Sequence, residues 1–246
     1  MNYIASITDF FKSPKWGMNL LLGIVAFIIP AVGPIVLAGW LITGLYGRKN
    51  DENPATFPDF DFQYFMKYLE RGVWPFLVSL VSSFALIPVM MVVMFVPMLL
   101  IGAMGSNSSG DGASIIGLLM MVVMFGLYAL AMAAFFFVTT PMIIRSTITQ
   151  DFAKAFDFGF VKRFLILTKG ELMMAALFML GVGIVYMILG VITCYLGFLA
   201  GGPVMFYAWH HLQKQLYKTY LSRGGDPVPY SPKLTDDIAT PPSLVK

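Results

Sequence analysis

The distribution of positive charge along this chain constrains its fold more than any other feature. All 16 Lys and Arg residues lie outside four long apolar blocks, at 16–47, 72–104, 115–144 and 172–209. Each block is longer than the ~20 apolar residues that a bilayer-spanning helix needs. The pattern therefore indicates an integral membrane protein.

Composition agrees with a membrane environment. Of the 246 residues, 58% are hydrophobic and 12% are charged, which leaves too few polar side chains to cover a water-soluble globule. In hydrocarbon, spanning segments must be helices or closed barrels because each unpaired backbone polar group is costly. The apolar runs lack the alternation of barrel strands, so we expect an all-α polytopic helical bundle. The net charge of +3 gives no support for nucleic-acid binding.

The basic residues also predict how the blocks are arranged. If every block crossed once, Lys and Arg would be divided between the two sides, against their tendency to stay cytoplasmic. If the first and last blocks double back, all 16 lie on the cytoplasmic side with both termini, and only the loop at 105–114 faces outward. This arrangement has four to six membrane segments. The alternative is one tilted, proline-kinked helix in each of these two blocks.

Block lengths favour the doubled-back arrangement. As a single helix, 172–209 would be about 57 Å long, nearly twice the hydrocarbon thickness, so two crossings fit. The first block is interrupted between Pro30 and Pro34. Its arms of about 12 residues, near 18 Å each, are too short to span a bilayer, so we expect a re-entrant hairpin.

We expect one helical membrane domain over 1–222. Aromatic residues at helical spacing predict interfacial helices at 1–15, 61–71 and 151–168. The proline-rich segment 223–246 is predicted to be a flexible cytoplasmic tail.

A small residue followed by proline occurs three times and predicts breaks between helices, since proline opens a helix easily. The predicted breaks are Gly33, Pro34, Thr140, Pro141, Gly202 and Pro203. Tryptophan follows the first and third prolines at the same spacing, and tryptophan anchors helices at headgroups. The predicted anchors are Trp16, Trp40, Trp74 and Trp209. Segments 60–69 and 156–165 also resemble each other, which suggests an internal duplication.

Several of these features together resemble a known family. They are the interfacial start, Pro30-Ala31-Val32-Gly33-Pro34, Gly39-Trp40-Leu41, and an acidic segment at 51–61 before an amphipathic helix. The chain resembles the prokaryotic multi-pass membrane family catalogued as domain of unknown function 4013, up to about Arg223. Where that family usually has an aliphatic-Gly-Tyr step, this chain has Gly39-Trp40. The resemblance implies a helical fold in a bacterial or archaeal cell membrane, and it brings no catalytic residues.

The residues give little support for chemistry. No ionisable side chain interrupts the block interiors, which counts against ion-coupled transport. The only histidines, His210 and His211, are helical neighbours that diverge by about 100°, so they do not easily share a metal ion. Cys194 has no neighbouring base in the sequence. We therefore predict no catalytic residues, metal site or cofactor.

Basic residues beside interfacial aromatics are candidates for binding anionic lipid headgroups. These candidates are Lys162, Arg163 and Lys169. We expect a non-enzymatic protein of a prokaryotic inner membrane that acts as a scaffold, accessory subunit or lipid-organising element of a membrane complex. Its expected partners are membrane lipids and other membrane-protein subunits, and no nucleic acid. The alternative is a transporter or channel for a neutral or hydrophobic solute, gated by proline-broken helices.

Overall fold

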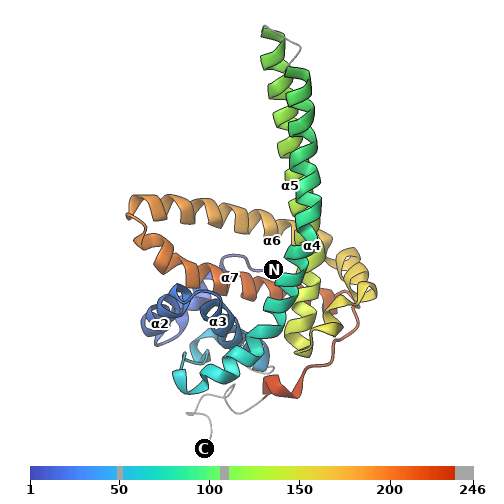
Figure 1. Cartoon of the computed structure of the whole chain (residues 1–246). Helices are drawn as coiled ribbons and strands as arrows, with labels where there is room; N and C mark the ends of the chain where they lie inside the picture. Colours follow the sequence, from blue (N-terminus) through green and yellow to red (C-terminus); the bar gives the residue numbers. More distant parts are fainter. Residues whose placement is uncertain (49–51, 106–110, 236–246) are drawn as a thin grey trace, which may run out of the picture. The chain divides into compact units, whose positions relative to one another are not determined.

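The computed structural model describes residues 1–48, 52–105 and 111–235, and over these residues all the regular structure is helical (Figure 1). The chain divides into two compact units. Unit 1 comprises Met1–Leu77 and Pro141–Lys246, and unit 2 comprises Val78–Thr140. The helices α4, Phe65–Gly105, and α5, Asp111–Thr149, each contribute residues to both units. The predicted all-α class is confirmed.

Three helices are long and apolar enough to cross a membrane: Phe62–Leu99, Leu118–Thr149 and Phe158–Ile192. Two shorter apolar helices, Trp16–Ile28 and Val32–Gly47, come from the first block. The three long helices belong to the second, third and fourth blocks, which supports membrane association.

Unit 1 contains most of the helical segments. They are α1 (Ala5–Thr8), η1 (Asp9–Lys12), α2 (Trp16–Ile28), α3 (Val32–Ile42), the π-helical turn η2 (Thr43–Gly47), η3 (Pro54–Thr56), η4 (Phe62–Tyr64), η5 (Ala153–Phe156), α6 (Phe158–Ile192), α7 (Leu196–Ser222) and η6 (Pro232–Thr235). Within this unit α6 packs against α7, and α2 packs against both α3 and α7.

Helix α3 lies at the core of unit 1. Its residues from Ile35 to Ile42 are all buried, because other segments surround the helix on every side. Glycine allows the closest of these contacts. A Cβ built on Gly39 would lie 1.7 Å from the carbonyl oxygen of Tyr68, and one on Gly72 would lie 1.9 Å from that of Ile35. The backbones of α3 and α4 therefore touch directly.

Both terminal blocks fold as helix–turn–helix segments. The first turn lies within the predicted interruption between Pro30 and Pro34, and the last turn lies before the predicted break at Gly202-Pro203. In the first block the turn is at Pro30 and Ala31, and Gly33 and Pro34 already belong to the first turn of α3. In the last block the turn is at 193–195, where Cys194 and Tyr195 have positive φ.

The predicted breaks at Thr140-Pro141 and Gly202-Pro203 are wrong, because α5 and α7 continue through both prolines. A proline inside a helix frees a carbonyl one turn earlier, and nearby hydroxyls and neighbouring helices reduce the cost. Pro141 leaves the carbonyl of Phe137 without its helical N–H, and the hydroxyl of Thr140 donates to the adjacent carbonyl, that of Phe136, at 2.7 Å. Pro203 packs against α2, where a Cβ on Gly23 would lie 3.0 Å from its ring.

The predicted interfacial segments at 61–71 and 151–168 are the starts of longer helices. The carboxylate of Asp61 accepts from the backbone N–H of Gln63, and Asp157 accepts from that of Phe160. Such N-caps start a helix, and no residue after either one stops it. The two similar sequence segments therefore have the same local structure, and each leads into a long apolar helix.

The described part of the C-terminal segment is packed, whereas the sequence predicted a flexible tail. Val228 and Leu234 are buried. The N–H of Val228 donates to the hydroxyl of Tyr217 at 2.8 Å, and that of Ser231 donates to the carbonyl of Ile148 at 2.9 Å. Composition missed this packing because isolated apolar residues between prolines carry no periodic signal. Residues 236–246, and residues 106–110 of the loop predicted to face outward, lie outside the described residues.

Candidate functional site

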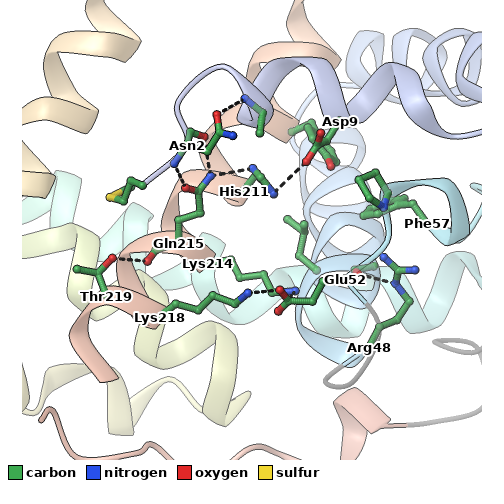
Figure 2. A pocket seen from close by; sticks show the side chains of 16 residues that line it. Asn2, Asp9, Arg48, Glu52, Phe57, His211, Lys214, Gln215, Lys218 and Thr219 are labelled. Carbon is green, nitrogen blue, oxygen red and sulfur yellow. Dashed lines mark hydrogen bonds and ion pairs between the residues drawn. The ribbon is translucent and has the colours of Figure 1, made fainter. Parts of the chain in front are cut away.

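A cavity of about 390 Å³ in unit 1 is lined by polar and charged side chains together with a few apolar ones (Figure 2). Four segments line it: the N-terminal stretch with η1, the end of η2 with Arg48, the segment 52–57, and α7 from Tyr207 to Thr219. Helix α7 supplies its polar residues at helical spacing. His211, Lys214, Gln215 and Lys218 share one face because residues three and four apart are neighbours on a helix.

Lys214 and Lys218 lie on either side of the carboxylate of Glu52. The ammonium of Lys214 is 3.7 Å from Oε1, and Lys218 donates to Oε2. The hydrogen bond from Lys218 lowers the pKa of Glu52, so this carboxyl is ionised at neutral pH. Burial lowers the pKa of Lys214 to about 8, since only 15% of its side chain is exposed. The nearby charges of Lys218 and Arg48 add to this shift, and Glu52 opposes it.

Arg48 is fixed beside the lysines by the backbone of its own loop. Its Nε donates to the carbonyl of Gly44 at 3.0 Å, and its Nη1 donates to the hydroxyl of Thr56 at 2.8 Å. The guanidinium also lies 5.5 Å from the ring centroid of Phe57, in a cation–π contact. Arg48 therefore contributes a positive charge at a fixed position.

The other end of the cavity joins the N-terminal segment to α7. The N–H of Asn2 donates to the side-chain oxygen of Gln215 at 2.6 Å, and the amide of Gln215 donates back to the carbonyl of Asn2 at 2.9 Å. Gln215 also lies 3.2 Å from Nδ1 of His211, whose Nε2 is 3.8 Å from Asp9. Burial lowers the pKa of His211 to about 4, although Asp9 opposes the shift. His211 is therefore neutral at pH 7.

The predicted residues are scattered over the fold. Trp40 is 1% exposed and donates to the carbonyl of Pro58 at 2.9 Å, so it packs in the core and cannot contact headgroups. Trp16 is exposed, as an anchor must be, and Trp74 and Trp209 are half-buried. None of the four tryptophans lines the cavity described above.

The three residues predicted to bind headgroups differ in whether their charges are already paired within the protein. Arg163 pairs with Asp226 and donates to the carbonyl of Gly224 at 2.7 Å, so its charge is used within the protein. Lys162 and Lys169 are exposed, and neither forms an ion pair with any residue that the structure describes.

The lysine pair of the cavity was missed by sequence reasoning. Lys214 and Lys218 have the four-residue spacing of one helical face, which was visible in the sequence. Their partner Glu52 lies far away in the chain, and no local pattern connects them. In the parts of the chain that the structure covers, no three metal-ligating side chains gather.

Comparison with known proteins gives one match. The family described as "Protein of unknown function (DUF4013)" matches residues 22–195 of this chain. No curated protein matches the chain, and no solved structure does. The matched region begins within α2, includes α3, α4, α5 and α6, and ends in the turn before α7.

Proposed function

Since the chain belongs to the DUF4013 family, we propose that it is a non-enzymatic subunit of a membrane complex, acting as a scaffold or accessory protein. Its site of action is the inner membrane of a prokaryotic cell, with both termini cytoplasmic. Its partners are membrane lipids and at least one other membrane protein. The unit 2 helices are the part that crosses the bilayer completely, and unit 1 holds the basic residues.

The apolar surface of unit 2 is the observation that carries this proposal. Over 78–99 and 118–140, large apolar side chains of both helices are exposed, among them Phe84, Met98, Leu119 and Leu130. Such a surface is stable only against lipid or against another apolar surface. Three of the hydroxyls here bond to carbonyls of their own helix: Ser83 donates to Ser79 at 2.8 Å, Thr139 to Phe135 at 2.8 Å and Thr140 to Phe136 at 2.7 Å. Unit 2 thus supplies membrane anchorage and contact area.

The arrangement of charged groups in unit 1 also supports a non-catalytic role. Glu171 pairs with Arg223, Asp157 with Arg145 and Glu52 with the α7 lysines, so these carboxylates hold segments together. The transport alternative depended on broken helices at Gly33-Pro34 and Gly202-Pro203. Because α7 continues through Gly202-Pro203 and packs against α2, the second of these two breaks no longer supports it.

The proposal is tested by isolating the protein from native membranes at its natural abundance. A tag is placed on the chromosomal copy, the membrane is extracted with a polymer that retains lipid, and the mass of the particle is measured. We expect a second membrane protein at a fixed ratio to this chain. A monomer that also conducts a neutral solute across liposomes would overturn the proposal and favour the transporter.

A further inference from the structure

We infer that the cavity beside α7 is a binding site for a phosphate group, held between Lys214 and Lys218. The phosphate belongs to a phospholipid headgroup or to a free phosphate-bearing solute. This inference goes beyond the proposed function, because the site could be occupied whether or not the protein has a protein partner.

Among the described residues that line the lysine end of the cavity, positive side chains outnumber carboxylates. Lys214 and Lys218 face one carboxylate there, that of Glu52, which pairs with both. The other described carboxylate of the cavity, Asp9, lies at the opposite end and pairs with Lys12 at 2.7 Å. Two lysines that share one carboxylate favour the entry of a further anion.

Burial strengthens this preference. The ammonium of Lys214 is largely removed from water, and its pKa falls to about 8 even though Glu52 is close. The carboxylate of Glu52 therefore does not fully offset the cost of burying this charge. A free phosphate or phosphate monoester carries up to two negative charges and three terminal acceptor oxygens, and a phosphodiester headgroup adds one charge and two such oxygens beside Glu52, so either would offset more of the cost.

The geometry of the lysine pair suits a phosphate. Glu52 bridges the two ammonium groups with one oxygen to each, and two phosphate oxygens can make the same bridge. Half of the Glu52 side chain is exposed, so it can leave toward solvent. The N–H groups of Arg48 donate to the carbonyl of Gly44 and the hydroxyl of Thr56. Arg48 therefore contributes positive charge to the site rather than a direct hydrogen bond to the phosphate.

Apolar side chains form the remaining wall of the cavity. Leu45 and Phe57 lie on the side of η2 and the following segment, and Tyr207 lies on α7. A phospholipid has apolar carbon beside its phosphate, and basic pockets between membrane helices bind such headgroups. This wall is the reason to include lipid as a source of the phosphate.

The test uses the purified full-length chain in a neutral detergent. Retention of phosphatidylglycerol and of phosphatidylcholine is counted by native mass spectrometry, and binding of inorganic phosphate is measured by calorimetry. The double variant K214Q/K218Q should weaken binding about tenfold or more, because two charge-assisted bonds are lost. The matched control is K67Q/K154Q, which removes the same charge from exposed positions outside the cavity and should change binding less than twofold.

A third variant separates binding from structural damage. Glu52→Gln breaks the same ion pairs as the lysine variant but removes the competing anion, so it should strengthen phosphate binding severalfold. Damage to the fold would weaken binding in both variants, and a weaker Glu52→Gln variant would therefore overturn the inference.

The two ligands identify the source of the phosphate. Saturable retention of phosphatidylglycerol that inorganic phosphate does not displace assigns a lipid headgroup. Saturable binding of inorganic phosphate assigns a free solute. Failure of both ligands, or equal losses in K214Q/K218Q and K67Q/K154Q, would overturn the inference. A partner protein found or missed in the isolation experiment changes none of these outcomes.

Discussion

At the scale of single residues, glycine determines how closely α3 and α4 approach. Gly39 faces the carbonyl of Tyr68, and Gly72 faces that of Ile35, at distances that leave no room for a methyl group. The obstacle on each side is backbone, which cannot rotate away as a side chain can. Substitution must therefore separate the two helices.

We expect Gly39→Ala to destabilise the protein by about 3 kcal/mol, because overpacking forces backbone shifts in a filled core. The loss should be seen as a lower melting temperature in detergent. Gly170→Ala is the control, since a Cβ there meets nothing within 4 Å and alanine favours a helix by up to about 1 kcal/mol over glycine. Equal melting temperatures for both variants would show that the close approach is not present.

The buried ammonium of Lys214 predicts a pH dependence. Its pKa of about 8 lies below the ordinary value of 10.5, chiefly because of burial. The folded state therefore binds this proton less tightly than the unfolded state. The penalty is fully present below pH 8 and disappears as the pH rises from 8 to 10.5, so Lys214 makes stability increase with pH in that window.

Lys214→Met should remove this contribution. We expect a variant that is more stable at pH 7, by at most roughly 3 kcal/mol, and whose melting temperature depends less steeply on pH between 8 and 10.5. The exposed Lys162→Met variant should keep the slope of the natural chain. An unchanged slope in Lys214→Met would mean that this lysine is well solvated.

At the scale of elements, the C-terminal segment closes over the ends of several helices. Val228 bonds to Tyr217 of α7, Ser231 bonds to Ile148 of α5, and the carbonyl of Lys233 accepts from Arg71 of α4. Arg71 is itself buried and donates to the hydroxyl of Thr43 at 2.7 Å. The segment therefore joins α4, α5 and α7 within unit 1.

Tyr217→Phe should weaken this closure. The buried N–H of Val228 loses its acceptor, which costs about 1–3 kcal/mol. The measurement is hydrogen exchange at Val228, which should become faster together with a fall in melting temperature. Tyr195→Phe is the control, because Tyr195 is 74% exposed in the turn between α6 and α7. Exchange that stays slow in Tyr217→Phe would contradict the role of this hydroxyl.

Elements with periodic or compositional signals could be predicted from the sequence, and those that depend on distant partners could not. The apolar blocks gave the helices, and short arms beside Pro30 gave the α2–α3 hairpin. The helix breaks predicted at Pro141 and Pro203 were wrong. The energetic cost of a proline inside a helix depends on neighbours such as Gly23, which lie close to it only in the folded protein. The lysine–Glu52 cluster was missed for the same reason, since 166 residues separate Lys218 from Glu52.

At the scale of the whole molecule, helix lengths limit how far the last block enters the bilayer. The apolar arm of α7, residues 196–209, rises about 21 Å, well short of the ~30 Å hydrocarbon core. The N-terminal segment reaches α6 at Phe178, where its ring is 5.5 Å from that of Tyr3. From Phe178 to the turn at Thr193, α6 rises about 22 Å. The apolar arm of α7 and the part of α6 beyond Phe178 are therefore similar in length, and each is shorter than the hydrocarbon core.

The α6–α7 hairpin should therefore enter the bilayer without crossing it, whereas α4 should cross completely. From Lys67 to Gly102, α4 rises about 52 Å, enough to pass through hydrocarbon and headgroups. The sequence alone favoured two crossings for the last block, because the summed length of both arms was sufficient. The position of the turn changes that expectation.

The single cysteine of the chain, Cys194, lies in this turn and provides the test. We expect an impermeant maleimide, applied outside intact cells, to leave Cys194 unlabelled until the protein is unfolded in detergent. In a Cys194→Ser background, Gly102→Cys should be labelled from outside, and Lys67→Cys only after the cells are permeabilised. Labelling of Cys194 from outside as fast as Gly102→Cys would show that the last block crosses twice. Labelling of Lys67→Cys from outside would instead reverse the orientation, because it would place the basic residues at the outer surface.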